Sequence, residues 1–174
     1  MRIVAAWVIA LSALALSPSV HAAPPAGPPK AQAAPPRIAG AWRLVETRQR
    51  MSDGSTRPDP DLGAHPGGYM IYDPSGRMCT VFNDTDPPRW AAAAPTEAEL
   101  RAMFNNTVVY CARYEVDEAR GYIAFHLDVT NSPNTAGANR ERRFTLVGDD
   151  LTLYPTPLPA GVAEWSIHLR RARP

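Results

Sequence analysis

Short runs of alternating apolar and polar residues, separated by turn signals, fill the chain from residue 38 onward. Alternation with a period of two is typical of strands that bury one face. Asp73-Pro74-Ser75-Gly76 has the Pro and Gly positions of a type I turn between two such runs. The pattern predicts an antiparallel all-β domain with eight strands, at residues 38–50, 68–72, 77–82, 107–116, 122–129, 140–147, 151–154 and 163–171.

One segment departs from this alternation. Thr96 is followed three residues later by Glu99, which is the spacing of a capping box at the start of a helix. The pattern predicts a short helix to about Asn106, with its apolar positions at Leu100, Met103 and Phe104. Such a short helix is not stable alone in water. We therefore expect it to pack on the sheet and to cover the mouth of the domain.

The two ends of the domain carry matching signals. Gly40-Ala41-Trp42 opens the first predicted strand, and Arg170 and Arg171 end the last one. A Trp at the start and an Arg at the end favour a sheet that closes on itself, with the Arg170 guanidinium lying over the Trp42 indole. Together with the consecutive hairpins, this predicts an eight-stranded antiparallel up-and-down barrel with one short helix. A two-sheet sandwich is the structural alternative.

The first 22 residues have the pattern of a signal peptide. A short positive start, Met1-Arg2, precedes an apolar run from Ile3 to Leu16, and Val20-His21-Ala22 offers small residues for cleavage near Ala22/Ala23. A membrane anchor is the alternative, but the run is shorter than the roughly 20 residues that a spanning helix needs. We expect a periplasmic or secreted protein without stable membrane insertion after cleavage. Residues 23–37 are a Pro/Ala-rich linker, and residues 38–174 form one domain.

Charge and motifs exclude several classes of function. Removing Arg2 with the signal reduces the 18 basic residues to 17, which balances the 17 acidic ones. No basic stripe remains that would follow a phosphate backbone, so nucleic-acid binding is disfavoured. The histidines lack metal-ligand spacing, and no G-x-S-x-G, phosphate loop or C-x-x-C occurs. The sequence predicts no metal, no cofactor and no catalytic residue, and it leaves the oligomeric state open.

The chain contains two cysteines, Cys79 and Cys111. Free buried thiols are possible, but an oxidising compartment favours a disulfide between them.

Weak motifs in a fixed order run through nearly the whole mature chain. They are Gly40-Ala41-Trp42-Arg43-Leu44-Val45, Gly68-Tyr69-Met70-Ile71-Tyr72, Thr96-Glu97-Ala98-Glu99, Tyr110-Cys111-Ala112-Arg113-Tyr114 and Gly148-Asp149-Asp150-Leu151. In these motifs the chain resembles the lipocalin-like domain family of small bacterial and fungal proteins. The resemblance implies a β-barrel around a small-molecule cavity. It also implies a departure, because relatives usually have Gly at Cys111 and a small polar residue at Cys79, which fits a cross-strand bridge beside the helix.

Arg142 is the residue most suggestive of function. It alternates with Phe144 and Leu146, so it points into the barrel if those two residues are core. A buried guanidinium needs a carboxylate or several hydroxyl groups around it, and Glu46 and Tyr114 are the natural candidates. Either Arg142 forms an internal ion pair or a plug under Trp42, or it anchors the acidic head of a ligand, as the resemblance suggests. The predicted ligand-binding residues are Arg142, Tyr114, Glu46, Tyr110, Phe125, Phe144, Met78 and Phe104.

Three functions follow from this sequence. The first is an exported, non-enzymatic barrel that binds a small hydrophobic or amphipathic molecule. The second is a cofactor-free isomerase, cyclase or hydrolase that uses the same cavity, although no convergent titratable cluster supports it. The third is a filled barrel with only a structural or interaction role.

Overall fold

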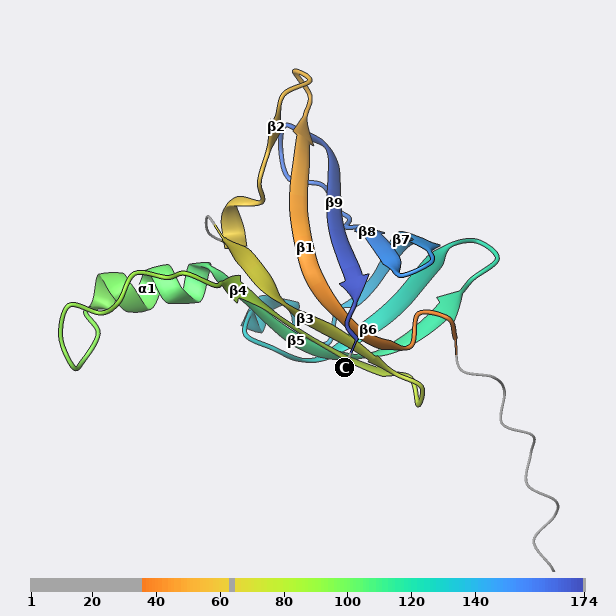
Figure 1. Cartoon of the computed structure of the whole chain (residues 1–174), viewed down its shortest axis with the longest axis horizontal. Coiled ribbons are helices and arrows are strands. Elements are labelled where there is room, and N and C mark those ends of the chain that lie inside the picture. Colours follow the sequence, from red (N-terminus) through yellow and green to blue (C-terminus); the bar gives the residue numbers. More distant parts are fainter. Residues whose placement is uncertain (1–35, 63–64, 174) are drawn as a thin grey trace, which may run out of the picture. The chain divides into compact units, whose positions relative to one another are not determined.

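The computed structural model describes residues 36–62 and 65–173 (Figure 1). The predicted signal peptide and all but the last two residues of the predicted linker lie outside the described residues. The strands are β1 (Gly40–Met51), β2 (Thr56–Arg57), β3 (Pro66–Asp73), β4 (Arg77–Asp84), β5 (Thr107–Asp117), β6 (Tyr122–Thr130), β7 (Asn139–Val147), β8 (Asp150–Tyr154) and β9 (Val162–Arg171). The helices are η1 (Pro60–Leu62), α1 (Glu97–Asn105) and η2 (Pro133–Thr135).

The strands form a closed antiparallel barrel. From β3 to β9 each strand pairs with its neighbour in sequence, and β1 pairs with both β3 and β9. The two-residue strand β2 adds only to the end of β1, so eight strands make the barrel wall. This confirms the predicted up-and-down barrel and rules out the sandwich. Closure leaves no long unpaired edge that could recruit another chain.

One end of the barrel is plugged by Trp42. Its indole nitrogen donates to the Ile38 carbonyl oxygen at 2.7 Å, and both side chains are completely buried. The guanidinium of Arg171 lies 4.2 Å from the Trp42 ring centroid. The prediction that Arg170 provides this contact is wrong, because alternation along β9 places Arg171 inward with Leu169 and sends Arg170 out to pair with Asp150.

A β-bulge in β1 changes which residues face the interior. Trp42 and Leu44 are buried, but the register with β9 shifts between Leu44 and Glu46. Beyond the shift Thr47 and Gln49 point inward. Glu46 points outward instead, and its carboxylate accepts a hydrogen bond from Arg48 Nε at 2.9 Å. The extra residue of a bulge reverses the alternation, which is why simple period-two counting placed Glu46 on the wrong face.

Helix α1 is capped as predicted but does not pack on the sheet. Thr96 Oγ1 accepts from the Glu99 backbone amide, and the Glu99 carboxylate accepts from the Thr96 amide, which completes the capping box. No residue of α1 is buried, and the helix extends away from β4 and β5 (Figure 1). The prediction that it covers the mouth is wrong. At the end opposite Trp42, η1 lies against β4 and β5 and buries Leu62 in the core.

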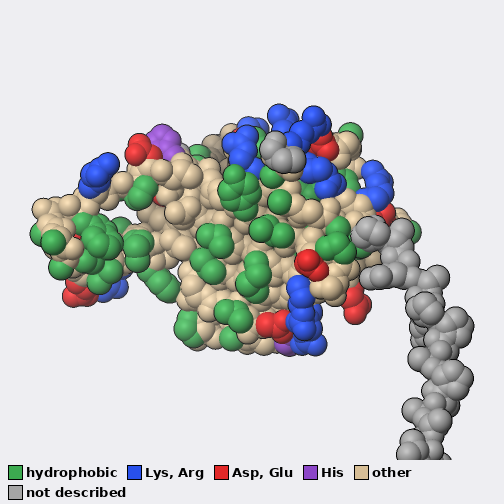
Figure 2. Space-filling view, turned by 60° about the horizontal axis from the view of Figure 1, so that its bottom comes forward, with side chains coloured by type: hydrophobic (Ala, Val, Ile, Leu, Met, Phe, Trp, Pro, Cys, Tyr) green, Lys and Arg blue, Asp and Glu red, His purple; other side chains and the backbone are tan. Residues whose placement is uncertain are grey.

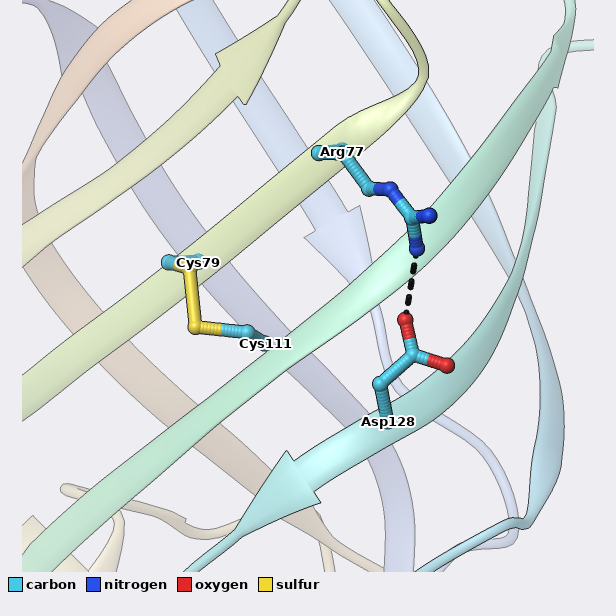
Figure 3. Close-up of a disulfide and its surroundings, with 4 residues drawn as sticks. All are labelled: Arg77, Cys79, Cys111 and Asp128. Atoms are coloured by element: carbon cyan, nitrogen blue, oxygen red, sulfur yellow. Dashed lines mark hydrogen bonds and ion pairs between the residues drawn. A yellow bond between two sulfur atoms is a disulfide. The ribbon is translucent and has the colours of Figure 1, made fainter.

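The two cysteines form a disulfide. Cys79 on β4 and Cys111 on β5 are direct cross-strand partners with a Cα–Cα distance of 4.1 Å. The bond lies on the outer face of the barrel, beside an ion pair between Arg77 on β4 and Asp128 on β6 (Figure 3). The predicted bridge between the strands that flank the helix is therefore confirmed.

Candidate functional site

Arg142 enters the barrel from the middle of β7. It alternates with the buried Phe144, and β7 pairs with β6 through Ile123 and with β8 through Leu153, both of them core residues. The guanidinium lies 4.8 Å from the centroid of the Phe125 ring and 5.9 Å from that of Tyr110. Arg142 therefore lies among aromatic side chains of the interior while remaining only partly buried.

The polar contacts of Arg142 are few. Its Nη1 donates to the Tyr110 hydroxyl at 3.1 Å, and its buried Nε makes no hydrogen bond to the described residues. Within residues 36–62 and 65–173, no carboxylate forms an ion pair with Arg142. The internal ion pair is thus absent from this part of the chain, and the guanidinium that lies over Trp42 is that of Arg171. The guanidinium keeps hydrogen-bonding capacity that the protein itself does not use.

A group of tyrosines continues the site towards the plugged end. Tyr110 stacks on Phe125 with centroids 6.1 Å apart, and Tyr72 meets Tyr114 edge to face at 5.0 Å. The Tyr114 hydroxyl donates to the Asp73 carbonyl oxygen at 2.9 Å. Burial raises the pKa of Tyr72 far above its usual value, so this phenol stays protonated. The tyrosines therefore offer hydroxyl groups and aromatic surface, and none of them is a carboxylate that would pair with Arg142.

A further polar atom is buried on the wall next to Tyr110. Thr80 on β4 pairs directly with Tyr110 on β5, and its side chain is completely buried. Its Oγ1 has no hydrogen-bond partner among the described residues. An unpartnered buried hydroxyl costs free energy, so a bound polar group beside Thr80 would stabilise the barrel.

Most of the predicted ligand-binding residues lie in the barrel interior, and two of them lie outside it. Six of them line the interior: Arg142, Tyr110, Tyr114, Phe125, Phe144 and Met78. Glu46 is excluded by the bulge in β1. Phe104 is excluded because it lies on α1 with 54% of its surface exposed. Neither of these two residues lies beside Arg142 in the interior.

Sequence reasoning missed two further residues of the interior. Tyr72 shares a strand face with Met70, and Thr80 shares one with Met78 and Phe82, so alternation alone could have placed both inside. They were overlooked because a single tyrosine or threonine in a strand is common and carries no motif.

Asp59 was missed for a different reason. It lies in the irregular segment before η1, where no periodicity indicates burial, yet only 3% of its surface is exposed. Burial raises the pKa of this carboxyl group, partly countered by the hydrogen bond that it accepts from the Asp61 backbone amide at 3.1 Å.

The arrangement is suited to binding an anion or a hydrogen-bond acceptor inside an aromatic barrel. Arg142 supplies the charge, Tyr110 and Thr80 supply hydroxyl groups, and the aromatic rings supply apolar surface. Among the residues that the structure describes, no group of three or more His, Cys, Asp or Glu side chains could hold a metal ion. No helix in the same part of the chain is long and apolar enough to cross a membrane.

Comparison with known proteins shows the family to which the barrel belongs. No curated protein matches the chain in sequence. The family model for the lipocalin-like domain matches residues 39–171, which is the whole barrel from the first strand to the last. The expected resemblance is therefore confirmed, and the chain belongs to the lipocalin-like domain family.

Proposed function

We propose that this barrel binds a small amphipathic molecule whose acidic head contacts Arg142 and Tyr110. The observation that carries the proposal is the guanidinium of Arg142, which lies inside the barrel without a carboxylate partner among the described residues. Removing a charge from water is costly unless it is paired. A ligand carboxylate would supply that pairing.

The surroundings of Arg142 support an apolar tail for the ligand. Phe125 and Phe144 lie on the interior beside the guanidinium, and Met70 and Met78 lie on the opposite wall formed by β3 and β4. Methionine side chains are flexible and adapt to different shapes. A chain of methylene groups would contact these side chains while its charged end remains at Arg142.

We also propose that the protein acts after export. The predicted signal peptide and the absence of stable membrane insertion in the mature chain come from the sequence, and the Cys79–Cys111 disulfide is consistent with an oxidising compartment. N-terminal sequencing of the protein from an exporting host tests this, since cleavage should leave Ala23 as the first residue.

The binding experiment compares a carboxylate with an uncharged analogue of the same length. Palmitate and hexadecanol are titrated separately into the purified mature protein, and binding is followed by isothermal calorimetry. A charged hydrogen bond contributes about 1.5–3 kcal/mol, so Arg142→Gln should weaken palmitate binding by roughly tenfold to one hundredfold. Hexadecanol binding should change little, because the alcohol carries no charge to pair.

Arg143→Gln is the matched control. Arg143 is adjacent on β7 but points outward, with its guanidinium 3.5 Å from the Tyr154 ring centroid. It should leave both affinities unchanged. Equal losses for palmitate and hexadecanol in Arg142→Gln would show that Arg142 shapes the interior without pairing to the ligand head.

A second candidate function rests on how completely the interior is filled. Trp42, Met70, Leu151, Leu153 and Leu169 have no exposed surface. A barrel packed by its own side chains would serve only a structural or interaction role. Native mass spectrometry separates the two functions. A mass excess that disappears on denaturation supports binding, whereas no excess and no uptake of palmitate supports the filled barrel.

A further inference from the structure

An apolar stripe crosses the outer face of the barrel over strands β3 to β6. Strand register places its members in two adjacent rows, so they form a continuous surface. Ile71 and Val129 at its two sides are 50% and 62% exposed. We define the stripe by Tyr69, Val81 and Val109 in one row and Ile71, Cys79, Cys111 and Val129 in the next.

A second exposed apolar surface lies on the segment between β4 and β5. We call residues 85–106 the arm. The Glu99 carboxylate holds it together by accepting hydrogen bonds from the Ala91 amide at 2.9 Å and the Thr96 amide at 2.7 Å. Its exposed apolar side chains are Trp90, Leu100, Met103 and Phe104. A groove of about 630 Å³ separates the Pro87-Pro88 stretch from α1.

Neither surface is covered within the described part of the chain. Helix α1 has nine residues and buries none of them, although helices of this length are marginal in water without tertiary packing. Large contiguous apolar patches are also rare on soluble monomers and mark interaction sites. A partner that covers α1 must offer apolar surface of its own, and the stripe offers it.

We propose that the arm of one copy of this chain docks on the stripe of a second copy, and the reverse, to form a symmetric dimer. The arm leaves β4 and returns into β5, two of the strands that carry the stripe. Hydrophobic side chains of the arm and of the adjoining sheet face are visible on the same side of the molecule (Figure 2). Because the arm and the stripe lie next to each other, a two-fold axis can place the arm of each copy on the stripe of the other copy. Each chain then contributes both halves of the contact.

The charges next to the two surfaces are complementary. The arm carries three acidic residues, Asp86, Glu97 and Glu99, and two basic ones. Beside the stripe, Arg77 and Arg113 both pair with Asp128, and the exposed Asp73 lies in register with Arg77, so the charges of this row balance. Arg43, which pairs in register with Tyr69, forms no ion pair with the described residues. The arm is thus slightly acidic, whereas Arg43 gives the border of the stripe one excess positive charge, and salt should weaken the dimer.

Sedimentation velocity over a concentration series of the mature protein tests this dimer. Phe104→Asp alters the arm, Ile71→Asp alters the stripe, and Val147→Asp is the control, because Val147 is 75% exposed on β7 outside both surfaces. Each of the first two variants should raise the dimer dissociation constant about tenfold or more. Val147→Asp should leave it unchanged. Circular dichroism confirms that all three variants retain the fold.

Hydrogen exchange separates contact between copies from contact within one copy. In the wild type, protection of the α1 amides should rise with protein concentration, and Ile71→Asp should abolish that rise although Ile71 lies on the stripe. Protection that does not depend on concentration would mean that the arm folds onto its own stripe. That result, a monomer at every concentration, or a dimer insensitive to both variants would overturn the proposal.

Discussion

Removing the Cys79–Cys111 disulfide should destabilise the barrel mainly by increasing the conformational entropy of the unfolded chain. The perturbation is the double variant Cys79→Ser/Cys111→Ser. The bond lies on the outer face and Cys79 is exposed, so the change opens no cavity in the core. The strands that it joins also remain paired, because β4 and β5 share a ladder of seven residue pairs. Any large loss of stability measured on the monomer therefore reports the cross-link itself.

The magnitude follows from the length of chain that the bond closes. The two cysteines are separated by 32 residues, a span that includes the arm and helix α1. On the chain-entropy model, closing a loop of this length in the unfolded state contributes about 3.7 kcal/mol at 25 °C. For a domain of this size, that loss corresponds to a decrease in melting temperature of roughly 10–15 °C.

Urea unfolding of the oxidised wild type and the double variant measures the effect. The variant should also show a larger m-value, because its unfolded chain is less constrained and exposes more surface. Wild-type protein unfolded in the presence of a reductant is the matched control and should lose the same free energy. A difference below about 1 kcal/mol between oxidised and reduced protein would refute the loop-closure reasoning.

Three further predictions concern other parts of the barrel. Arg171→Gln removes the cation that lies over Trp42 and should lower the free energy of unfolding by about 1–3 kcal/mol, whereas Arg170→Gln should leave it nearly unchanged, as measured by urea unfolding. Because the pKa of Asp59 is raised on folding, ionisation of its carboxyl group opposes folding as pH rises from the ordinary aspartate value through the raised one. Asp59→Asn should therefore gain stability relative to wild type across that pH interval, and a constant difference would contradict the assignment. Thr96→Ala should cost α1 about 1 kcal/mol and speed exchange of its amides, without moving the urea midpoint of the monomer, because the helix buries no residue.

The wall of the barrel was predictable because its determinants are local. Alternation, the turn at Asp73-Pro74-Ser75-Gly76 and the capping box at Thr96 each depend on a few neighbouring residues, and all three occur as expected. Closure was predictable because Trp42 and the terminal arginines mark the first and the last strand of the barrel. What the sequence did not show was that α1 stands away from the sheet, since an apolar helix face indicates that a contact is needed and not which surface provides it.

The site was predictable only where side chains alternate regularly between the inner and the outer face of a strand. Arg142, Tyr110 and Phe125 lie on strands whose alternation is unbroken around them, and the structure brings these three side chains together. Glu46 follows a bulge, so its predicted face was reversed. Arg170 and Arg171 differ by one position, and only the register of β9 against β1 decides between them. The lack of a carboxylate partner for Arg142 could not be predicted either. It depends on which carboxylates point out of the barrel, and for Glu46 this is decided by the bulge in β1.

Because β1 pairs with β9, the barrel can close only through a contact between strands that are far apart in sequence. These two strands are more than a hundred residues apart in sequence, so the pair that closes the barrel is also its most distant contact. Contacts of this separation form late and slow the folding reaction. A nascent chain that has not yet produced β9 must keep β1 and β8 with unpaired edges, where other chains can attach. The barrel can therefore close only once β9 has been synthesised, and a truncation that removes β9 should cause the chain to aggregate before it can bind a ligand.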